Sequence, residues 1–200
     1  MPEVRLVMKI LLVEDHADSR RNLQRLIERR GHEVVAVASS EEAEAVLATQ
    51  SFPFLILDWM LPGKSGVELC RELRLRDRGD EMFILLVTAR ADTDDLQQAL
   101  EAGANDYLTK PLDLGLLNVR LSVAERQIRD LSERNQARAA LQESARTVTN
   151  ILEKTTDGFF AVDRDWKFKY LNREAEALFG RKRHQLLGMD LWQSFPDLFR

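Results

Sequence analysis

The first half of the chain alternates short apolar runs with longer stretches in which apolar side chains recur at helical spacing. A short apolar run that ends at a turn signal is typical of a strand buried in a parallel sheet. Helical stretches that close on a glycine are typical of helices lying between such strands. The expected strands are residues 9–13, 34–37, 54–58, 82–87 and 106–109, and the expected helices are 18–30, 39–47, 67–75, 94–102 and a last one from residue 113.

Strand–helix units repeated in this way predict one parallel sheet with helices on both of its faces. Because crossovers between parallel strands are right-handed, the topology reduces to a doubly wound sheet. In such a sheet the carboxyl ends of the strands meet along one edge, where α/β proteins bind their ligands. We therefore expect an α/β domain with a doubly wound, five-stranded parallel sheet.

Polar side chains follow the predicted strands at this edge: Glu14 and Asp15 after the first, Asp58 at the third, Thr88 at the fourth and Lys110 after the fifth. Clustered carboxylates repel one another and need a cation, and oxygen ligands favour Mg²⁺. An amine and a hydroxyl suit phosphoryl oxygens. The pattern predicts phosphoryl chemistry on a carboxylate nucleophile. The alternative is that these residues are solvated charges on separate loops and share no function.

Residues 8–124 resemble a receiver domain of two-component signalling. The matching residues are Glu14-Asp15, Asp58 within the segment 58–66, Thr88-Ala89 and Lys110-Pro111. The resemblance implies a flavodoxin-like sheet of order 2-1-3-4-5. It also implies that Asp58 accepts a phosphoryl group from the phosphohistidine of a histidine kinase or phosphotransfer protein. The implied Mg²⁺ ligands are Glu14, Asp15, Asp58 and the backbone carbonyl of Met60.

The same resemblance assigns roles to the other edge residues. Thr88 would bond a phosphoryl oxygen, Lys110 would pair with the acyl phosphate, and Tyr107 would be a switch aromatic that turns inward. The Lys110-Pro111 peptide would be cis, a form that is costly except before proline. Met60 and Arg90 occupy positions that tune dephosphorylation in the family. Such a domain promotes its own phosphoryl transfer and dephosphorylation, so whether the chain should be called an enzyme stays open.

Other classes fit the residues less well. A phosphatase of the haloacid dehalogenase type needs a second Asp two residues after its nucleophile, and Met60 stands there. A dinucleotide-binding domain needs a glycine-rich first turn, whereas residues 13–17 are acidic and contain no glycine. A pseudo-receiver that only mediates assembly remains as an alternative, against which the intact set of edge residues argues.

From Asp113 the helical pattern continues to about Glu153, well past the predicted receiver. Apolar residues alternate at three- and four-residue spacing, the pattern of a coiled-coil seam. The first part of this seam is Leu114, Leu117, Leu121, Ala124, Ile128 and Leu131, and after a break it resumes as Leu141, Ala145, Val148 and Leu152. We expect a coiled-coil linker over residues 125–153 and a parallel homodimer. A solvated single helix acting as a spacer is the alternative.

The last segment, residues 154–200, predicts strands at 159–163 and 166–171 and short helices at 173–179 and 184–187. It resembles the first part of a PAS sensor domain through Asp157-Gly158-Phe159, Asp163, Asn172, Ala175, Phe179-Gly180 and Leu186-Leu187-Gly188. The resemblance implies a partial α+β PAS segment whose remaining strands lie beyond Arg200, in a sensory protein such as a histidine kinase or a cyclase. No PAS ligand follows from these residues.

Composition narrows the remaining choices. The chain has 200 residues and a net charge of −4, so nothing in it points to nucleic acid. A single cysteine, Cys70, excludes an internal disulfide framework and a cysteine-based zinc site. No apolar run approaches the roughly 18 residues that span a membrane, and the N-terminus lacks the layout of a signal peptide. We therefore expect a cytoplasmic protein with no membrane segment in this chain.

Overall fold

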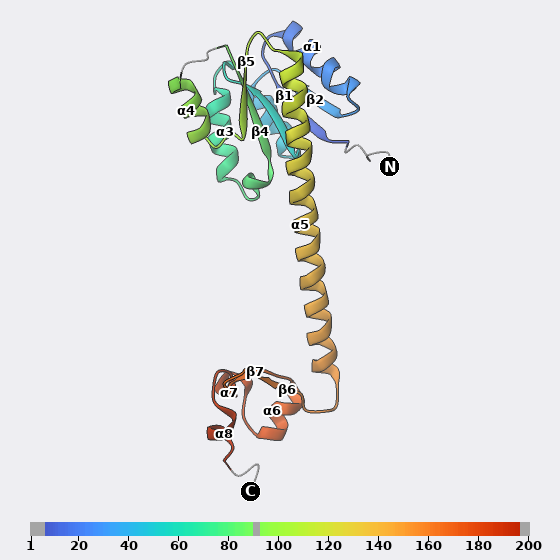
Figure 1. The fold of residues 1–200 in the computed structure, drawn as a ribbon, viewed down its shortest axis with the longest axis vertical. Coiled ribbons are helices and arrows are strands. Elements are labelled where there is room, and N and C mark those ends of the chain that lie inside the picture. The colour runs from blue at the N-terminus through green and yellow to red at the C-terminus, as the bar shows by residue number, and fades with distance from the viewer. Residues whose placement is uncertain (1–6, 90–92, 197–200) are drawn as a thin grey trace. The chain divides into compact units, whose positions relative to one another are not determined.

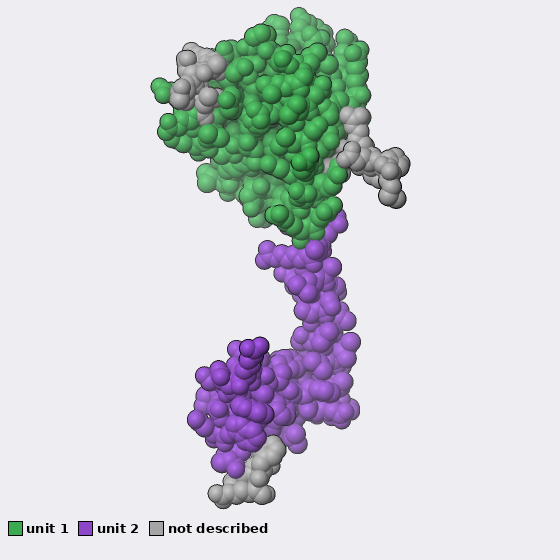
Figure 2. Space-filling model, viewed as in Figure 1, with its two compact units in different colours: residues 1–134 green, residues 135–200 purple. Residues whose placement is uncertain are grey.

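The computed structural model describes residues 7–89 and 93–196. The chain divides into two compact units, residues 1–134 and residues 135–200 (Figure 2). Arg90, to which the receiver resemblance assigns an influence on dephosphorylation, lies outside the described residues. Within the described residues, no helix is both long enough and apolar enough to cross a membrane.

The first unit contains a five-stranded parallel sheet in the order β2-β1-β3-β4-β5, which confirms the predicted topology (Figure 1). Its strands are β1 (Lys9–Val13), β2 (Glu33–Val37), β3 (Phe54–Asp58), β4 (Phe83–Thr88) and β5 (Asp106–Thr109). Its helices are α1 (Ala17–Arg29), α2 (Ser40–Leu47), α3 (Gly66–Leu75), the short 3₁₀ helix η1 (Gly79–Glu81), α4 (Thr93–Glu101) and the start of α5 (Leu114–Lys154). The sequence did not predict η1.

Alternate residues of each strand enter one of two cores, because successive side chains of a strand point to opposite faces. Leu11 and Leu55 belong to the core under α2, α3 and α4, whereas Ile10 and Ile56 belong to the core under α1 and α5. In Figure 1, α3 and α4 accordingly lie on the opposite side of the sheet from α1. The near-continuous apolar runs of the strands follow from this burial on both faces.

The first part of the predicted coiled-coil seam is wrong at four of its positions, Leu117, Leu121, Ala124 and Ile128. Leu117, Leu121 and Ala124 are buried against the sheet of their own chain, and Ile128 packs against the same core. These side chains are not available to a partner helix. A helix that covers a sheet and a helix that pairs with another helix both place apolar residues at three- and four-residue spacing. The spacing of apolar residues therefore predicted the buried face of α5 correctly. It could not show whether a sheet or another helix packs against that face.

The second unit contains the end of α5 and a small antiparallel sheet, in agreement with the predicted α+β segment. Its other elements are β6 (Phe160–Val162), β7 (Phe168–Leu171), α6 (Arg173–Phe179), α7 (Arg183–Leu186) and α8 (Leu191–Ser194). The sequence did not predict α8. The core of this unit consists of Phe168, Leu171, Ala175, Leu186 and Leu191.

Asn172 holds the second unit together. Its Oδ1 accepts the N–H groups of Phe159 and Ala175 at 2.8 and 2.9 Å, and so caps α6. Its Nδ2 donates to the carbonyl oxygens of Leu152 and Asp157, both at 2.8 Å. One buried amide therefore ties the last turn of α5 to β6 and α6, with donors and acceptors both satisfied.

Two residues that flank the turn between α1 and β2 hold α5 on the first unit. The guanidinium of Arg30 donates to the carbonyl oxygen and the Oδ1 of Asn118, at 2.9 and 2.8 Å, and to the Oγ of Ser122 at 3.2 Å. The buried ring of His32 accepts the N–H of Met8 at Nδ1, and its Nε2 lies 3.1 Å from the Oε1 of Glu125. These polar contacts therefore add to the apolar packing of α5 against the sheet.

Replacing Glu125 by Ala should lower the free energy of unfolding of the first unit by about 2 kcal/mol, because a buried imidazole and an arginine lose their carboxylate partner. Glu143→Ala, at an exposed position of the same helix, changes helix propensity equally and should alter the value by less than about 0.5 kcal/mol. Urea unfolding followed by circular dichroism measures both. Equal effects of the two substitutions would show that the contact with Glu125 does not stabilise the unit.

Candidate functional site

The polar residues predicted to meet at the carboxyl edge of the sheet do meet there. Asp58 ends β3 and is paired in register with Val87 of β4, and Thr88 is paired with Thr109 of β5. Carboxylate oxygens of Glu14, Asp15 and Asp58 all lie within 4.8 Å of one another. Because these strands are adjacent and parallel, their last residues are brought to one place by the sheet itself.

Lys110 is the cation of this cluster. Its Nζ donates to the Oδ2 of Asp58 at 2.6 Å and to the Oε2 of Glu14 at 2.9 Å. The Glu14 and Asp58 residues are only 1% and 4% exposed, so their charges are poorly screened by water. The ammonium group therefore offsets the repulsion between two buried carboxylates.

The pKa values of the site follow from this arrangement. Burial raises the pKa of the Glu14 carboxyl above its usual range and the charge of Asp58 adds to the rise, against the opposing hydrogen bond from Lys110. Burial disfavours the charged amine of Lys110, but its hydrogen bonds to Asp58 and Glu14 outweigh burial and raise its pKa. Lys110 is therefore positively charged at neutral pH. A further positive charge at the site would stabilise the ionised form of the Glu14 carboxyl.

The loop after β3 presents the Asp58 side chain. The N–H of Met60 donates to the Oδ1 of Asp58 at 3.2 Å, so the two oxygens of this carboxylate have different partners. Gly66 packs so closely under the loop that a Cβ there would overlap the carbonyl oxygen of Asp58. Ser65 and Glu68 form a capping box that begins α3. The Ser-x-x-Glu spacing of this capping box is a local sequence signal for the start of α3.

Thr88 and Tyr107 lie on the neighbouring strands β4 and β5. Thr88 is buried, and its carbonyl oxygen accepts the N–H of Lys110 at 2.7 Å. Tyr107 is half-buried and packs against the core under α2, α3 and α4. The Lys110-Pro111 peptide is cis, as expected. Thr88 ends β4 and Lys110 follows β5, so both residues lie at the carboxyl edge of the sheet that carries Asp58.

The donor set suits a hard divalent cation. Glu14, Asp15 and Asp58 offer only oxygen, and Asp15 is exposed, which leaves the cluster open to solvent. All-oxygen sites with room for water favour Mg²⁺ over zinc or copper. His16, the nearest imidazole in the sequence, is exposed and accepts the N–H of Ser19 at 3.4 Å as the cap of α1. His16 is therefore a surface residue.

Comparison with known families supports this assignment of the fold. A model of the family described as "Response regulator receiver domain" matches residues 10–122, and a model of the PAS fold matches residues 147–198. The receiver match spans more than half of the chain and contains every polar residue of the site.

Individual proteins match the same part of the chain. The phosphate regulon transcriptional regulatory protein PhoB of Pseudomonas aeruginosa is 36% identical over 118 residues, 59% of this chain and 52% of that protein. The transcriptional regulatory protein AfsQ1 of Streptomyces coelicolor is 39% identical over 118 residues, 59% of this chain and 51% of that protein. The chain therefore spans about half the length of the curated relatives it matches.

Solved structures agree. The signal receiver domain of a signal transduction histidine kinase from Syntrophus aciditrophicus matches with a TM-score of 0.58 and 27% identity, covering 61% of this chain and 92% of that one. A response regulator from Chloroflexus aurantiacus matches with a TM-score of 0.58 and 32% identity, covering 60% of this chain and 99% of that one. Both similarities concern the first unit.

Replacing Gly66 by Ala should lower the free energy of unfolding by about 1–3 kcal/mol, because the new Cβ must displace the backbone of Asp58. The same displacement should disturb the carboxylate, seen as a shifted NMR signal of the Lys110 ammonium. Gly115→Ala is the matched control, because its Cβ would meet only a side-chain oxygen of Asp113 at 3.0 Å and no backbone atom, so it should lower the free energy of unfolding far less. Similar losses in both variants would contradict a specific close approach at Gly66.

Proposed function

Because the chain belongs to the response regulator receiver family and carries a PAS fold after its long helix, we propose that it is a phosphorylation-dependent signalling module of a two-component phosphorelay. The observation that carries the proposal is the convergence of Glu14, Asp15 and Asp58 within 4.8 Å, with the Lys110 ammonium on Asp58. A buried carboxylate held beside two other carboxylates and one amine is suited to attack phosphorus.

The proposed reaction uses Asp58 as the nucleophile. One carboxylate oxygen of Asp58 forms a bond to the phosphorus of a phosphohistidine, the P–N bond breaks, and the donor imidazole keeps the electron pair and takes up a proton. The N–H of Met60 and the Nζ of Lys110 hold the two carboxylate oxygens in position before attack. After transfer, Lys110 would move onto a phosphoryl oxygen, and the Thr88 hydroxyl would donate to another.

Mg²⁺ bound by Glu14, Asp15, Asp58 and the Met60 carbonyl would neutralise charge on the transferring group. The chain's own contribution is to keep these oxygens together although they repel. Burial, with a smaller contribution from the charge of Asp58, raises the pKa of Glu14, so a divalent cation at the site would stabilise the folded unit.

Thr88 and Tyr107 are the proposed route from the site to the rest of the molecule. Their strands are hydrogen-bonded neighbours, and Tyr107 is only half-buried. A hydroxyl drawn toward a phosphoryl oxygen would leave space into which the aromatic ring can turn. We propose that this change passes through α5 to the PAS segment.

Further parts of the proposal concern the whole protein. The proposed organisation is a receiver at 8–124, a helical linker at 125–153 and part of a PAS domain at 154–200, acting in the cytoplasm with a histidine kinase or phosphotransfer protein as phosphodonor. The curated relatives above are transcriptional regulators and are matched over about half of their length, whereas residues 147–198 of this chain match the PAS fold. A pseudo-receiver used only for assembly would not require a complete set of site residues, so phosphoryl transfer is the better-supported function.

We expect acetyl phosphate to label the chain only when Mg²⁺ is present, because the carboxylates need a divalent cation to accept an anionic donor. Asp58→Asn should reduce labelling by at least about 10²-fold, since an amide is a poor nucleophile. Asp18→Asn, which removes an exposed carboxylate on α1, is the control and should label normally. Labelling of Asp58→Asn at the wild-type level, or labelling in excess chelator, would refute the assignment.

Thr88→Ala should leave labelling largely intact but uncouple Tyr107. In the wild type, beryllofluoride with Mg²⁺ should shift the NMR signals of the Tyr107 ring, and in Thr88→Ala the shift should be largely lost. Thr109→Ala removes the hydroxyl that lies opposite Thr88 in the sheet register and should keep the response. If Tyr107 responds equally in all three proteins, the proposed route is wrong.

A further inference from the structure

The middle of α5 is a long stretch of helix with no cover. Every residue from Ser132 to Ile151 is exposed, whereas the parts of α5 before and after it contain residues seated in the first or the second unit. A solvent-exposed spacer helix should be polar on all sides. This stretch is not, and its apolar side chains therefore require an explanation.

The exposed apolar side chains lie on one stripe. Leu141, Val148 and Ile151 are 72%, 54% and 58% exposed. Together with the small residues Ala137 and Ser144 they follow one another at spacings of four, three, four and three residues. That alternation is the core pattern of a two-stranded coiled coil.

The structure selects this stripe over the one expected from sequence. The predicted seam placed Ala145 and Leu152 beside Leu141 and Val148. Leu152 is half-buried, and its carbonyl oxygen accepts a hydrogen bond from Asn172 inside the second unit. Ile151, one position earlier, is exposed. The positions that remain exposed and can form the core of a coiled coil are therefore those of the stripe that includes Ile151.

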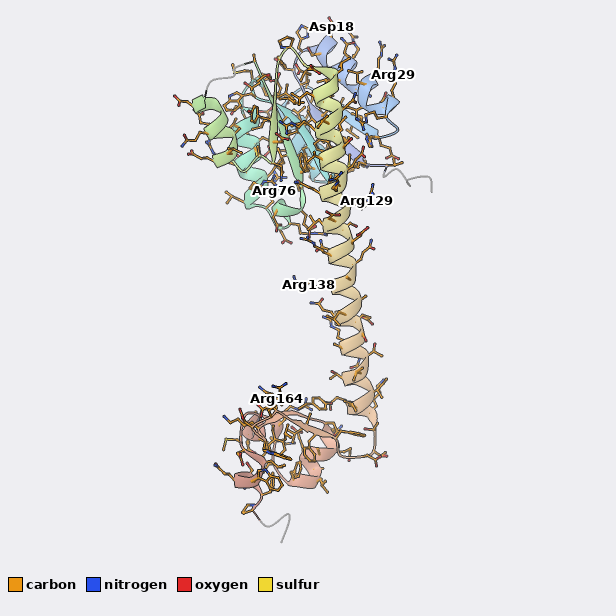
Figure 3. All side chains as sticks on the ribbon, in the orientation of Figure 1. Asp18, Arg29, Arg76, Arg129, Arg138 and Arg164 are labelled. Carbon is orange, nitrogen blue, oxygen red and sulfur yellow. The ribbon has the colours of Figure 1, made fainter. Side chains whose placement is uncertain are left out.

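The positions beside the stripe fit a second copy of the same helix. Ala140, Ala145 and Thr147 flank the stripe and are small and uncharged, so two helices can approach closely. Farther toward the N-terminus, Glu133 and Arg138 occupy flanking positions five residues apart. In a parallel pair, Glu133 of one copy would face Arg138 of the other, and the symmetry of the pair would form this contact twice. Arg138 extends from the exposed part of α5 (Figure 3).

We propose that a second copy of this chain pairs with α5 in parallel along the seam formed by Ala137, Leu141, Ser144, Val148 and Ile151. The proposal deepens the proposed signalling function and rests on it, because the pairing would supply the element through which one receiver's state reaches both PAS segments. Arg134 would occupy the next core position and limits the seam to about two heptads. A seam this short pairs weakly, so its occupancy can change with the state of the receiver.

Crosslinking tests the seam and its direction. Leu141→Cys should form a disulfide-linked dimer under mild oxidation, because parallel helices place the two Leu141 positions side by side. Ala139→Cys, on the opposite side of the helix, should not. The wild type is the blank, because Cys70 is buried. Equal crosslinking at both positions, or at Ala139 alone, would overturn the proposal, and crosslinking only between Leu141→Cys and Ser144→Cys chains would replace it with an antiparallel pair.

Sedimentation equilibrium tests the pairing without a crosslink. The wild type should show a concentration-dependent rise above the 23.0 kDa of one chain. Leu141→Glu should weaken dimerisation by about 10²-fold, and Ala139→Glu, its matched control, should leave it unchanged. Glu133→Arg and Arg138→Glu should each weaken it by about fivefold and restore it when combined. A wild type that is monomeric at all concentrations, or a Leu141→Glu chain that dimerises normally, contradicts the seam.

Phosphoryl labelling of the same variants separates this proposal from the proposed function. Leu141→Glu leaves every site residue unchanged and should still be labelled at Asp58 by acetyl phosphate with Mg²⁺. A labelled chain that never dimerises would refute only the seam. A chain that dimerises through Leu141 but cannot be labelled would refute only the phosphorelay function.

Discussion

The contact of one lysine with two buried carboxylates is the interaction on which the functional part of this protein depends. Glu14 and Asp58 lie almost fully buried at the ends of neighbouring strands, where their charges would repel strongly. The Lys110 ammonium donates hydrogen bonds to both carboxylates and so offsets this repulsion. Lys110 reaches them only because β5 completes the sheet order, so the topology of the whole sheet is a condition for this one contact.

Under the proposed function, the same constraint would let the site change state. Lys110, which contacts both carboxylates here, would turn to a phosphoryl oxygen after transfer, with a divalent cation taking its place beside the carboxylates. Burial strengthens the ion pairs of Lys110 in each of these two arrangements. It also makes arrangements in which a buried charge has no partner costly in free energy. In the proposed mechanism, a site built in this way would favour two discrete states over a gradual response, and the half-buried Tyr107 on β5 would change position with it.

Helix α5 has a different role in each part of its length. Leu117, Leu121 and Ala124 serve as core residues of the first unit, and Arg30 and His32 hold the same part of the helix from the side. Its last turn is bonded to Asn172 within the second unit. The exposed part between them, residues 132–151, packs in neither core, and its apolar stripe is the seam proposed above for a second chain.

The sequence pattern alone determined the strands, the doubly wound parallel sheet and the polar residues that stand at the strand ends, because buried parallel strands are continuous apolar runs. The strand order came from the resemblance to receiver domains. Caps such as Ser39 and Asn172 were equally readable, since capping is local chemistry. The close approach at Gly66 and the contact of His32 with Glu125 were not, because both join residues that only folding brings together. The face of α5 was predicted and its partner was not: helical spacing shows which side is apolar, and only the tertiary structure decides whether a sheet, another unit or a second chain covers it.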